Sequence, residues 1–119
     1  MAEIEITSTK VIVHIRGADQ FFALKSQLEV PLEHIARVDA NAPEAQDIWH
    51  GLRLGGTNLP GVVTAGRFLQ HGEWAFWDVH DPDKAIAIRL RDEHYAKLII
   101  GVEDPTATAP VINEAIQRL

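Results

Sequence analysis

The stretch that decides the fold is residues 73–102, EWAFWDVHDPDKAIAIRLRDEHYAKLIIGV. Apolar and polar residues alternate along much of it: Ile86 and Ile88 fall on one face and Arg89 on the other. This is the two-residue period of a β-strand. The Asp-Pro-Asp sequence at 81–83 is typical of a turn, as is the polar segment Asp-Glu-His at 92–94. The stretch therefore predicts three successive strands, over 73–80, 84–91 and 96–102.

Similar patterns continue toward the N-terminus, for a total of seven or eight strands. Pro31 indicates a bend or an edge position, because proline cannot donate to a sheet, and His71-Gly72 is a hairpin turn. Residues 18–27 favour one or two helical turns, with Asp19 as a cap. The further predicted strands cover 2–7, 10–16, 28–40, 49–54 and 64–70.

The C-terminal segment predicts one amphipathic helix. Asp104 is suited to the N-cap and Pro105 to the first helical position. Because Pro110 follows about one turn later, we expect the regular helix to begin near Thr108. We expect the inward-facing stripe of this helix to consist of its large and small apolar residues, Val111, Ile112, Ala115, Ile116 and Leu119.

These patterns predict a fold that is mainly β with one C-terminal α-helix. Short connections favour antiparallel pairing, and the sheet must bury its apolar face. We expect a strongly bent antiparallel sheet or partly open barrel, with the helix closing one end; a β-sandwich is the alternative. The chain of 119 residues is read as a single domain, with residues 104–119 as its capping helix.

Composition narrows the classes of function. The net charge is -6, so the chain lacks the excess of basic residues that nucleic-acid binding requires. The same charge disfavours membrane association by the chain on its own. The absence of cysteine excludes disulfides, thiolate metal sites and a cysteine nucleophile. The first ten residues do not have the pattern of a signal peptide, so the cytoplasm is the expected location.

The middle of the chain resembles the small bacterial pleckstrin-homology-like (PH-like) domains. The resemblance extends from about Lys10 to Ala115. It is carried by Trp49-His-Gly-Leu-Arg-Leu-Gly-Gly-Thr57, Leu59-Pro-Gly61, Ala65-Gly-Arg-Phe68, Gly72, Phe76-Trp77, Ala85–Leu90, Leu98–Val102 and Asp104-Pro105, and by Phe21–Leu24 with Leu28–Ile35.

The resemblance implies two nearly orthogonal antiparallel sheets capped by a C-terminal helix. It also implies binding roles toward lipid headgroups, peptides or proteins, and some members assemble into rings. Lipid-binding members carry several Lys and Arg residues between the first two strands. The corresponding Ser8-Thr9-Lys10 has one base, so the chain departs from the lipid-binding pattern.

Two pairs of residues are candidates for binding. Arg53 and Arg67 lie in the glycine-flanked strands, where a guanidinium could bind a carboxylate or a headgroup; a structural salt bridge is the alternative. Trp74 and Trp77 fall on opposite faces of one strand, so we expect one in the core and the other exposed as an interface anchor.

No catalytic set emerges from the sequence. Ser8 and Ser26 lie outside any nucleophile motif. His80, Asp81 and Asp83 form the densest group of metal-ligand types, although a turn is the better explanation for the aspartates. We therefore predict a non-enzymatic module without a cofactor that acts through protein contacts and self-associates. Binding of a small molecule or lipid headgroup at Arg53 and Arg67 is the alternative, and a metal-dependent enzyme the weakest hypothesis.

Overall fold

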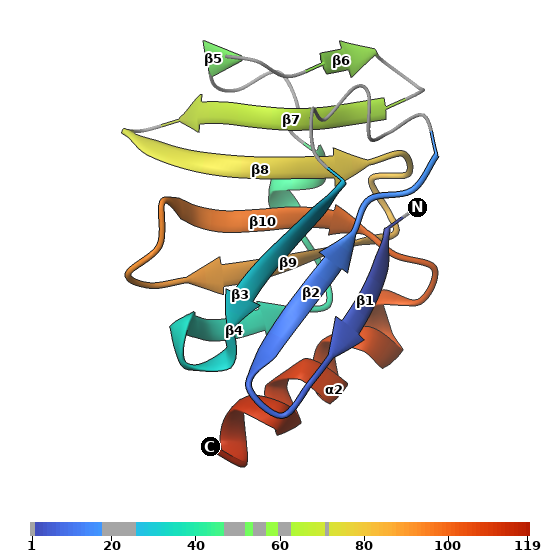
Figure 1. The fold of residues 1–119 in the computed structure, drawn as a ribbon. Helices are drawn as coiled ribbons and strands as arrows, with labels where there is room; N and C mark the ends of the chain where they lie inside the picture. The colour runs from blue at the N-terminus through green and yellow to red at the C-terminus, as the bar shows by residue number, and fades with distance from the viewer. Residues whose placement is uncertain (1, 18–25, 47–51, 54–56, 60–62, 71) are drawn as a thin grey trace.

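The computed structural model describes residues 2–17, 26–46, 52–53, 57–59, 63–70 and 72–119 (Figure 1). The predicted helical turns at 18–27 therefore lie largely outside the described residues, as does most of the strand predicted over 49–54. The described elements are β1 (Glu3–Ile6), β2 (Lys10–His14), β3 (Gln27–Pro31), η1 (Leu32–His34), β4 (Ile35–Asp39), η2 (Pro43–Gln46), β5 (Leu52–Arg53), β6 (Thr57–Leu59), β7 (Val63–Gln70), β8 (Glu73–Val79), β9 (Ala85–Leu90), β10 (Tyr95–Gly101) and α2 (Pro105–Gln117).

The N-terminal strands form a small antiparallel sheet with the order β1-β2-β3. The first hairpin is closed by the Thr7 N–H, which donates to the Lys10 carbonyl at 2.9 Å. Val11 and Val13 of β2 are buried, as the alternation of the sequence predicts. The sheet thus has one apolar face, and Figure 1 shows its strands running obliquely across those of the larger sheet.

The larger sheet has the order β4-β9-β10-β8-β7-β5, with β6 also pairing with β7. Strand β10 lies between β8 and β9 and runs parallel to β8 and antiparallel to β9. The parallel pair departs from the expected all-antiparallel arrangement, because the turn after β8 carries the chain past the neighbouring position, which β10 then fills. The apolar run Leu98-Ile99-Ile100 suits this position, since a central strand is covered on both faces.

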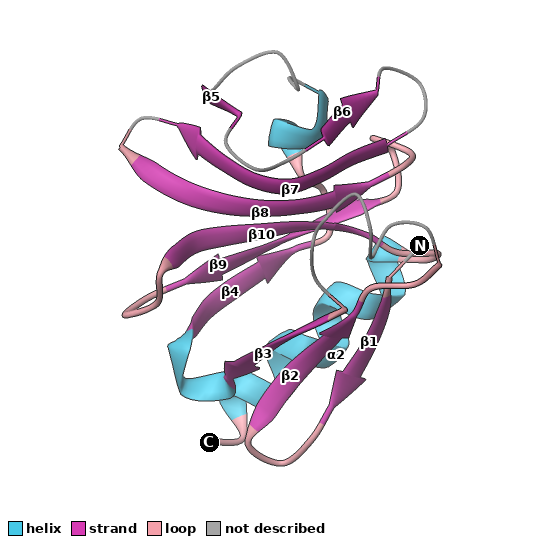
Figure 2. Ribbon diagram, turned by 45° about the horizontal axis from the view of Figure 1, so that its top comes forward, coloured by secondary structure: helices cyan, strands magenta, loops and turns pink. Residues whose placement is uncertain are grey.

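The described fold is mainly β with one C-terminal helix, as predicted. The two sheets do not close into a barrel, and a bent, partly open arrangement results. Figure 2 shows the small sheet and α2 on one side of the large sheet. No helix in the described part of the chain is long and apolar enough to cross a membrane.

Each face of the large sheet carries a hydrophobic cluster. The main core joins both sheets to α2 and includes Phe76, Ile88 and Ile112. The opposite face carries a second cluster, in which Ala42 and Ala45 from the η2 region pack with Trp77. Alternate residues of one strand therefore enter different clusters, which is the physical consequence of the two-residue period.

Helix α2 begins at Pro105, as the Asp104-Pro105 signal predicts, and not near Thr108, where Pro110 suggested that the regular helix would begin. The Asp104 carboxylate accepts a hydrogen bond from the Ala107 N–H at 3.2 Å, which confirms the predicted cap. Pro110 lies inside the helix, so the proline does not delay its start.

The predicted inward stripe of α2 is partly wrong. Ala109 and Ile112 are buried, and Ala115 and Ile116 pack against the core from its margin. In contrast, Val111 is 53% exposed and Leu119 is 66% exposed. Successive helical residues are separated by about 100°, so Val111 falls at the rim of a contact that is centred on Ile112.

Helix α2 also covers one edge of the large sheet. The Val38 N–H in β4 donates to Asn113 Oδ1 at 2.9 Å, and Asn113 Nδ2 donates to the Val38 carbonyl at 2.8 Å. The side-chain amide thereby replaces a neighbouring strand at this position and satisfies the edge.

Candidate functional site: the groove beside strand β1

Strand β1 forms an edge of the small sheet, since only β2 pairs with it among the described strands. Thr7 and Lys10 form a hydrogen-bonded pair. Along two antiparallel strands, hydrogen-bonded pairs alternate with pairs that are not hydrogen-bonded to each other. Ile4 and Ile6 therefore direct their backbone N–H and carbonyl groups away from β2. The amide of Ala2 has the same direction, and it donates to the Gly101 carbonyl at 3.3 Å.

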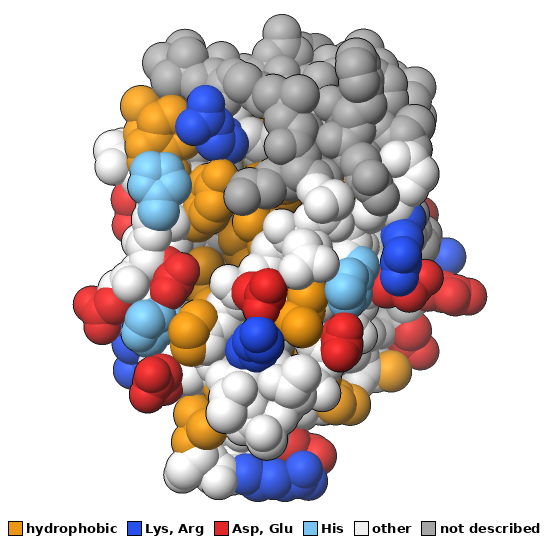
Figure 3. Space-filling model, in the orientation of Figure 1, with side chains coloured by type: hydrophobic (Ala, Val, Ile, Leu, Met, Phe, Trp, Pro, Cys, Tyr) orange, Lys and Arg blue, Asp and Glu red, His pale blue; other side chains and the backbone are white. Residues whose placement is uncertain are grey.

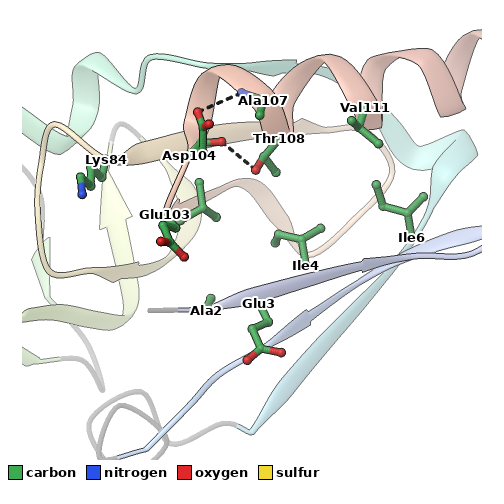
Figure 4. A pocket seen from close by; sticks show the side chains of 11 residues that line it. Ala2, Glu3, Ile4, Ile6, Lys84, Glu103, Asp104, Ala107, Thr108 and Val111 are labelled. Carbon is green, nitrogen blue, oxygen red and sulfur yellow. Dashed lines mark hydrogen bonds between the residues drawn. The ribbon is translucent and has the colours of Figure 1, made fainter.

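A groove runs between β1 and α2 (Figure 4). It has a volume of about 970 Å³. Ile4 and Ile6 point from the strand toward the helix, which presents Thr108 and Val111 from the other side. The groove therefore combines a strand edge with an apolar wall.

The apolar surface continues past the end of β1. A second hollow of about 450 Å³ shares Ile6 with the groove and is also lined by Ala115 and Leu119. Val111 and Leu119 are the large hydrophobic side chains found exposed in the described part of the chain. Both border this continuous hollow surface, which we call the β1 groove.

Charged residues occupy both ends of the β1 groove. Glu103 and Asp104 line the end near the start of β1, together with Lys84. Glu3 also borders this end, but its carboxylate points away from the helix (Figure 4). Arg118 lies at the other end. The carboxylates thus outnumber Lys84 at the end near the start of β1, so this end of the groove is negatively charged, whereas the other end carries the basic Arg118.

The opposite face of the small sheet carries exposed ion pairs. Arg16 Nη2 donates to Glu3 at 2.8 Å, and His14 Nε2 lies 2.9 Å from Glu5 Oε1. The Glu3 and Glu5 side chains remain 68% and 55% exposed. Each carboxylate can therefore accept a further partner. On this side of the molecule acidic, basic and apolar side chains intermingle (Figure 3).

The structure places Arg67 and Trp74 together. The Arg67 guanidinium carbon lies 5.5 Å from the centre of the Trp74 ring, within the range of a cation–π contact. The Trp74 ring also stacks on His94, at a ring separation of 5.8 Å. Burial raises the pKa of the adjacent Tyr95. Trp74 is half-buried, so part of this surface is open to solvent.

The other two candidates are placed differently. Trp77 is buried in the second cluster, where Phe68 contacts it edge to face at 5.8 Å. The tryptophans therefore do face opposite sides, with Trp77 in the core. The backbone of Arg53 in β5 pairs with Phe68 of β7, and its side chain lies outside what the structure describes.

A charged cluster anchors η2 to the large sheet. Glu44 accepts hydrogen bonds from Arg89 and from Lys97, and Arg89 also donates to Asp39 of β4 at 3.0 Å. Burial by itself raises the pKa of Glu44, but the hydrogen bonds from Arg89 and Lys97 outweigh it and lower the pKa to about 2. The cluster serves as a structural tie between β4 and its neighbours.

The turn that contains His80, Asp81 and Asp83 behaves as a turn. The Asp83 N–H donates to Asp81 Oδ1 at 2.9 Å, which is an Asx-type contact. Within the described ranges, no three His, Asp or Glu side chains gather in a way that could hold a metal ion.

Sequence reasoning missed the β1 groove because it assigned Val111 and Leu119 to the core. Ala109 was the available signal: including it would have moved the centre of the stripe toward Ile112. Comparison with known proteins adds no relative, since no family model, curated protein or solved structure matches the chain. The resemblance to PH-like domains stays a prediction.

Proposed function

We propose that this chain is a non-enzymatic binding module that receives an extended segment of another protein in the β1 groove. The observation that carries the proposal is the position of Val111 and Leu119, which are exposed apolar side chains beside an edge strand. Clustered exposed apolar residues mark interaction surfaces. We keep the cytoplasm as its setting, because nothing in a cysteine-free chain requires an oxidising compartment.

Strand addition is the mode of binding that suits this edge. The outward-facing peptide groups of Ile4 and Ile6 can pair with the backbone of an incoming strand, while alternate side chains of that strand enter the groove. The helix wall at Val111 supplies the apolar contact that a bare sheet edge lacks. Backbone pairing would give affinity, and the apolar wall would give selectivity.

The protein is also predicted to self-associate, and a second copy is the alternative occupant of the β1 groove. Antiparallel pairing of two β1 strands would bring Glu3 and Glu5 of one copy near the same residues of the other. Like charges at facing positions are destabilising. The charge pattern therefore favours a different protein over a second copy at this edge.

The proposal is tested by selecting ten-residue peptides from a random display library on the purified chain. The Ile4 and Ile6 amides should become protected from hydrogen exchange when a selected peptide binds. Val111→Glu should weaken binding at least tenfold, which corresponds to about 1.4 kcal/mol. Gln117→Glu is the matched control, because Gln117 is exposed on the same helix, away from the residues that line the groove.

Two results would overturn the proposal: peptides that protect other amides, or equal effects of the two helix variants. Light scattering over a range of concentrations tests whether a second copy of the chain, and not another protein, occupies the groove. A dimer that Val111→Glu dissociates would assign the groove to a second copy.

A small anionic ligand at Arg67 is a second candidate function, favoured by the exposed guanidinium over Trp74. Carboxylates and phospholipid headgroups are the classes to screen, because the guanidinium fork matches their oxygens. A thermal shift that Arg67→Ala abolishes would support it. Shifts of equal size in the variant would remove it.

A further inference from the structure

We infer that the segment recognised by the β1 groove alternates apolar residues with lysine or arginine. This inference rests on the proposed function and names the chemistry of the partner. It follows from the two kinds of side chain that alternate along β1, whose sequence is Glu-Ile-Glu-Ile.

The apolar half of the pattern comes from the inward face of β1. Residues directly opposite one another in neighbouring antiparallel strands point to the same face. Partner residues opposite Ile4 and Ile6 would therefore point toward Val111 on the helix. Valine, isoleucine or leucine at these positions would extend the apolar surface that the chain leaves exposed.

The basic half comes from the outward face. Partner residues opposite Glu3 and Glu5 would lie beside carboxylates that are more than half exposed. Arg16 and His14, which now pair with these carboxylates, lie on the β2 side of the strand. The side of each carboxylate toward the free edge therefore remains accessible to a partner residue. A lysine or arginine there would gain a cross-strand ion pair.

The end of the β1 groove adds to the same preference. Glu103 is exposed and makes no side-chain hydrogen bond or ion pair with the described residues. Lys84 is the single base among the residues that line this end of the groove. The local excess of negative charge would steer a basic segment toward the edge and repel an acidic one.

The experiment uses three fluorescent peptides of one length: alternating Lys-Val, alternating Glu-Val, and a Lys-Val peptide of the same composition with its residues in blocks. Fluorescence anisotropy with the full chain should give a Kd for the alternating basic peptide at least tenfold lower than for either of the others. A tenfold ratio corresponds to about 1.4 kcal/mol. Added salt should reduce the advantage, since the pairs are exposed.

Matched variants of the protein should reverse the preference between the basic and the acidic peptide. Glu3→Lys combined with Glu5→Lys should transfer the preference to the alternating acidic peptide. Glu33→Lys is the control, because Glu33 is exposed in η1 and does not line the groove. Glu3→Gln with Glu5→Gln should remove most of the preference without adding charge, and circular dichroism verifies that each variant is folded.

Backbone pairing is tested on the peptide, where no refolding of the protein is involved. N-methylation at the valines, which lie opposite Ile4 and Ile6, should abolish binding, whereas N-methylation at the lysines should leave it nearly unchanged. Binding at the groove with no dependence on charge would overturn the inference and leave the proposed function intact. Absence of binding by all three peptides would overturn the inference, and the library selection separately decides the proposed function.

Discussion

Two strand edges of this molecule receive opposite treatment. The edge of β4 is covered by α2, whose Asn113 side chain makes both hydrogen bonds that a neighbouring strand would make to Val38. The edge of β1 faces the same helix across a groove, with exposed Val111 in place of a polar cap. A single helix thus closes one edge and leaves the other open to a partner.

The difference shows how a short helix can serve two purposes. Its buried residue Ile112 and the amide of Asn113 attach it to the large sheet, and the adjacent Val111 is left over for the groove. In the proposed function, stability and binding would therefore be carried by neighbouring residues on different sides of α2. The predictions below test this division.

The largest effect is expected for Ile112→Ala, which creates a cavity in the main core. We expect it to lower the free energy of unfolding by about 2–5 kcal/mol. Val111→Ala, one residue away, should change it by less than about 0.5 kcal/mol. Urea denaturation of both variants measures the contrast, and similar losses would show that Val111 is part of the core.

Acid should weaken the anchorage of η2 on the large sheet through Glu44. Its pKa is lowered to about 2 in the folded state from a usual value of 4.5, so its contribution is present above pH 4.5 and disappears as the pH falls toward 2. That contribution amounts to at most about 3 kcal/mol. Glu44→Gln should lose at most this much at neutral pH and little near pH 2.

Urea unfolding of the wild type and of Glu44→Gln across this pH range provides the measurement. Glu3→Gln is the control, because the exposed Glu3–Arg16 pair belongs to the open edge and exposed pairs contribute about 0–1 kcal/mol. A constant difference between wild type and Glu44→Gln at all pH values would contradict the assignment.

Asn113→Ala should open the closed edge. It leaves the N–H and carbonyl of Val38 without their side-chain partner, which costs about 1–3 kcal/mol. The Val38 amide should then exchange its hydrogen faster, while the Ile4 amide stays as it was. Unchanged exchange at Val38 would mean that Asn113 does not protect the edge.

Removal of the helix cap should have the smallest effect. Asp104→Ala takes away the acceptor for the Ala107 N–H and is expected to cost about 1 kcal/mol. Asp104→Asn, which keeps an acceptor oxygen, should restore most of the loss. Thermal denaturation of the two variants checks this, and equal losses would show that charge and not capping is responsible.

Local patterns of the sequence predict most elements well and their partners poorly. The single strand predicted over 28–40 is wrong, because η1 divides this segment into β3 and β4, which lie in different sheets. The alternation in residues 84–91 and the Asp104-Pro105 start signal depend on neighbouring residues, and both are confirmed. The position of β10 depends on which strands it pairs with in the folded sheet. The alternation of apolar and polar residues within a strand does not indicate its neighbours. The parallel pairing with β8 was therefore beyond the sequence patterns.

The candidate site shows the same limit. The predicted hairpin at His71-Gly72 already implies that Arg67 lies diagonal to Trp74, and the register confirms it. The β1 groove had only the weak signal of Ala109, because an apolar residue at the rim of a helix stripe looks like one at its centre until the helix is docked. Arg53 illustrates the remaining case, in which a candidate side chain lies outside the described structure.

The inserted position of β10 has a consequence for the order of folding. Strands β8 and β9 leave their connecting turn one strand apart, so they cannot form a hairpin with each other. Among the described strands, the pairing that unites the two halves of the large sheet runs through β10. We therefore expect the two halves of the large sheet to be joined only when this late segment pairs, and such non-local pairing slows folding.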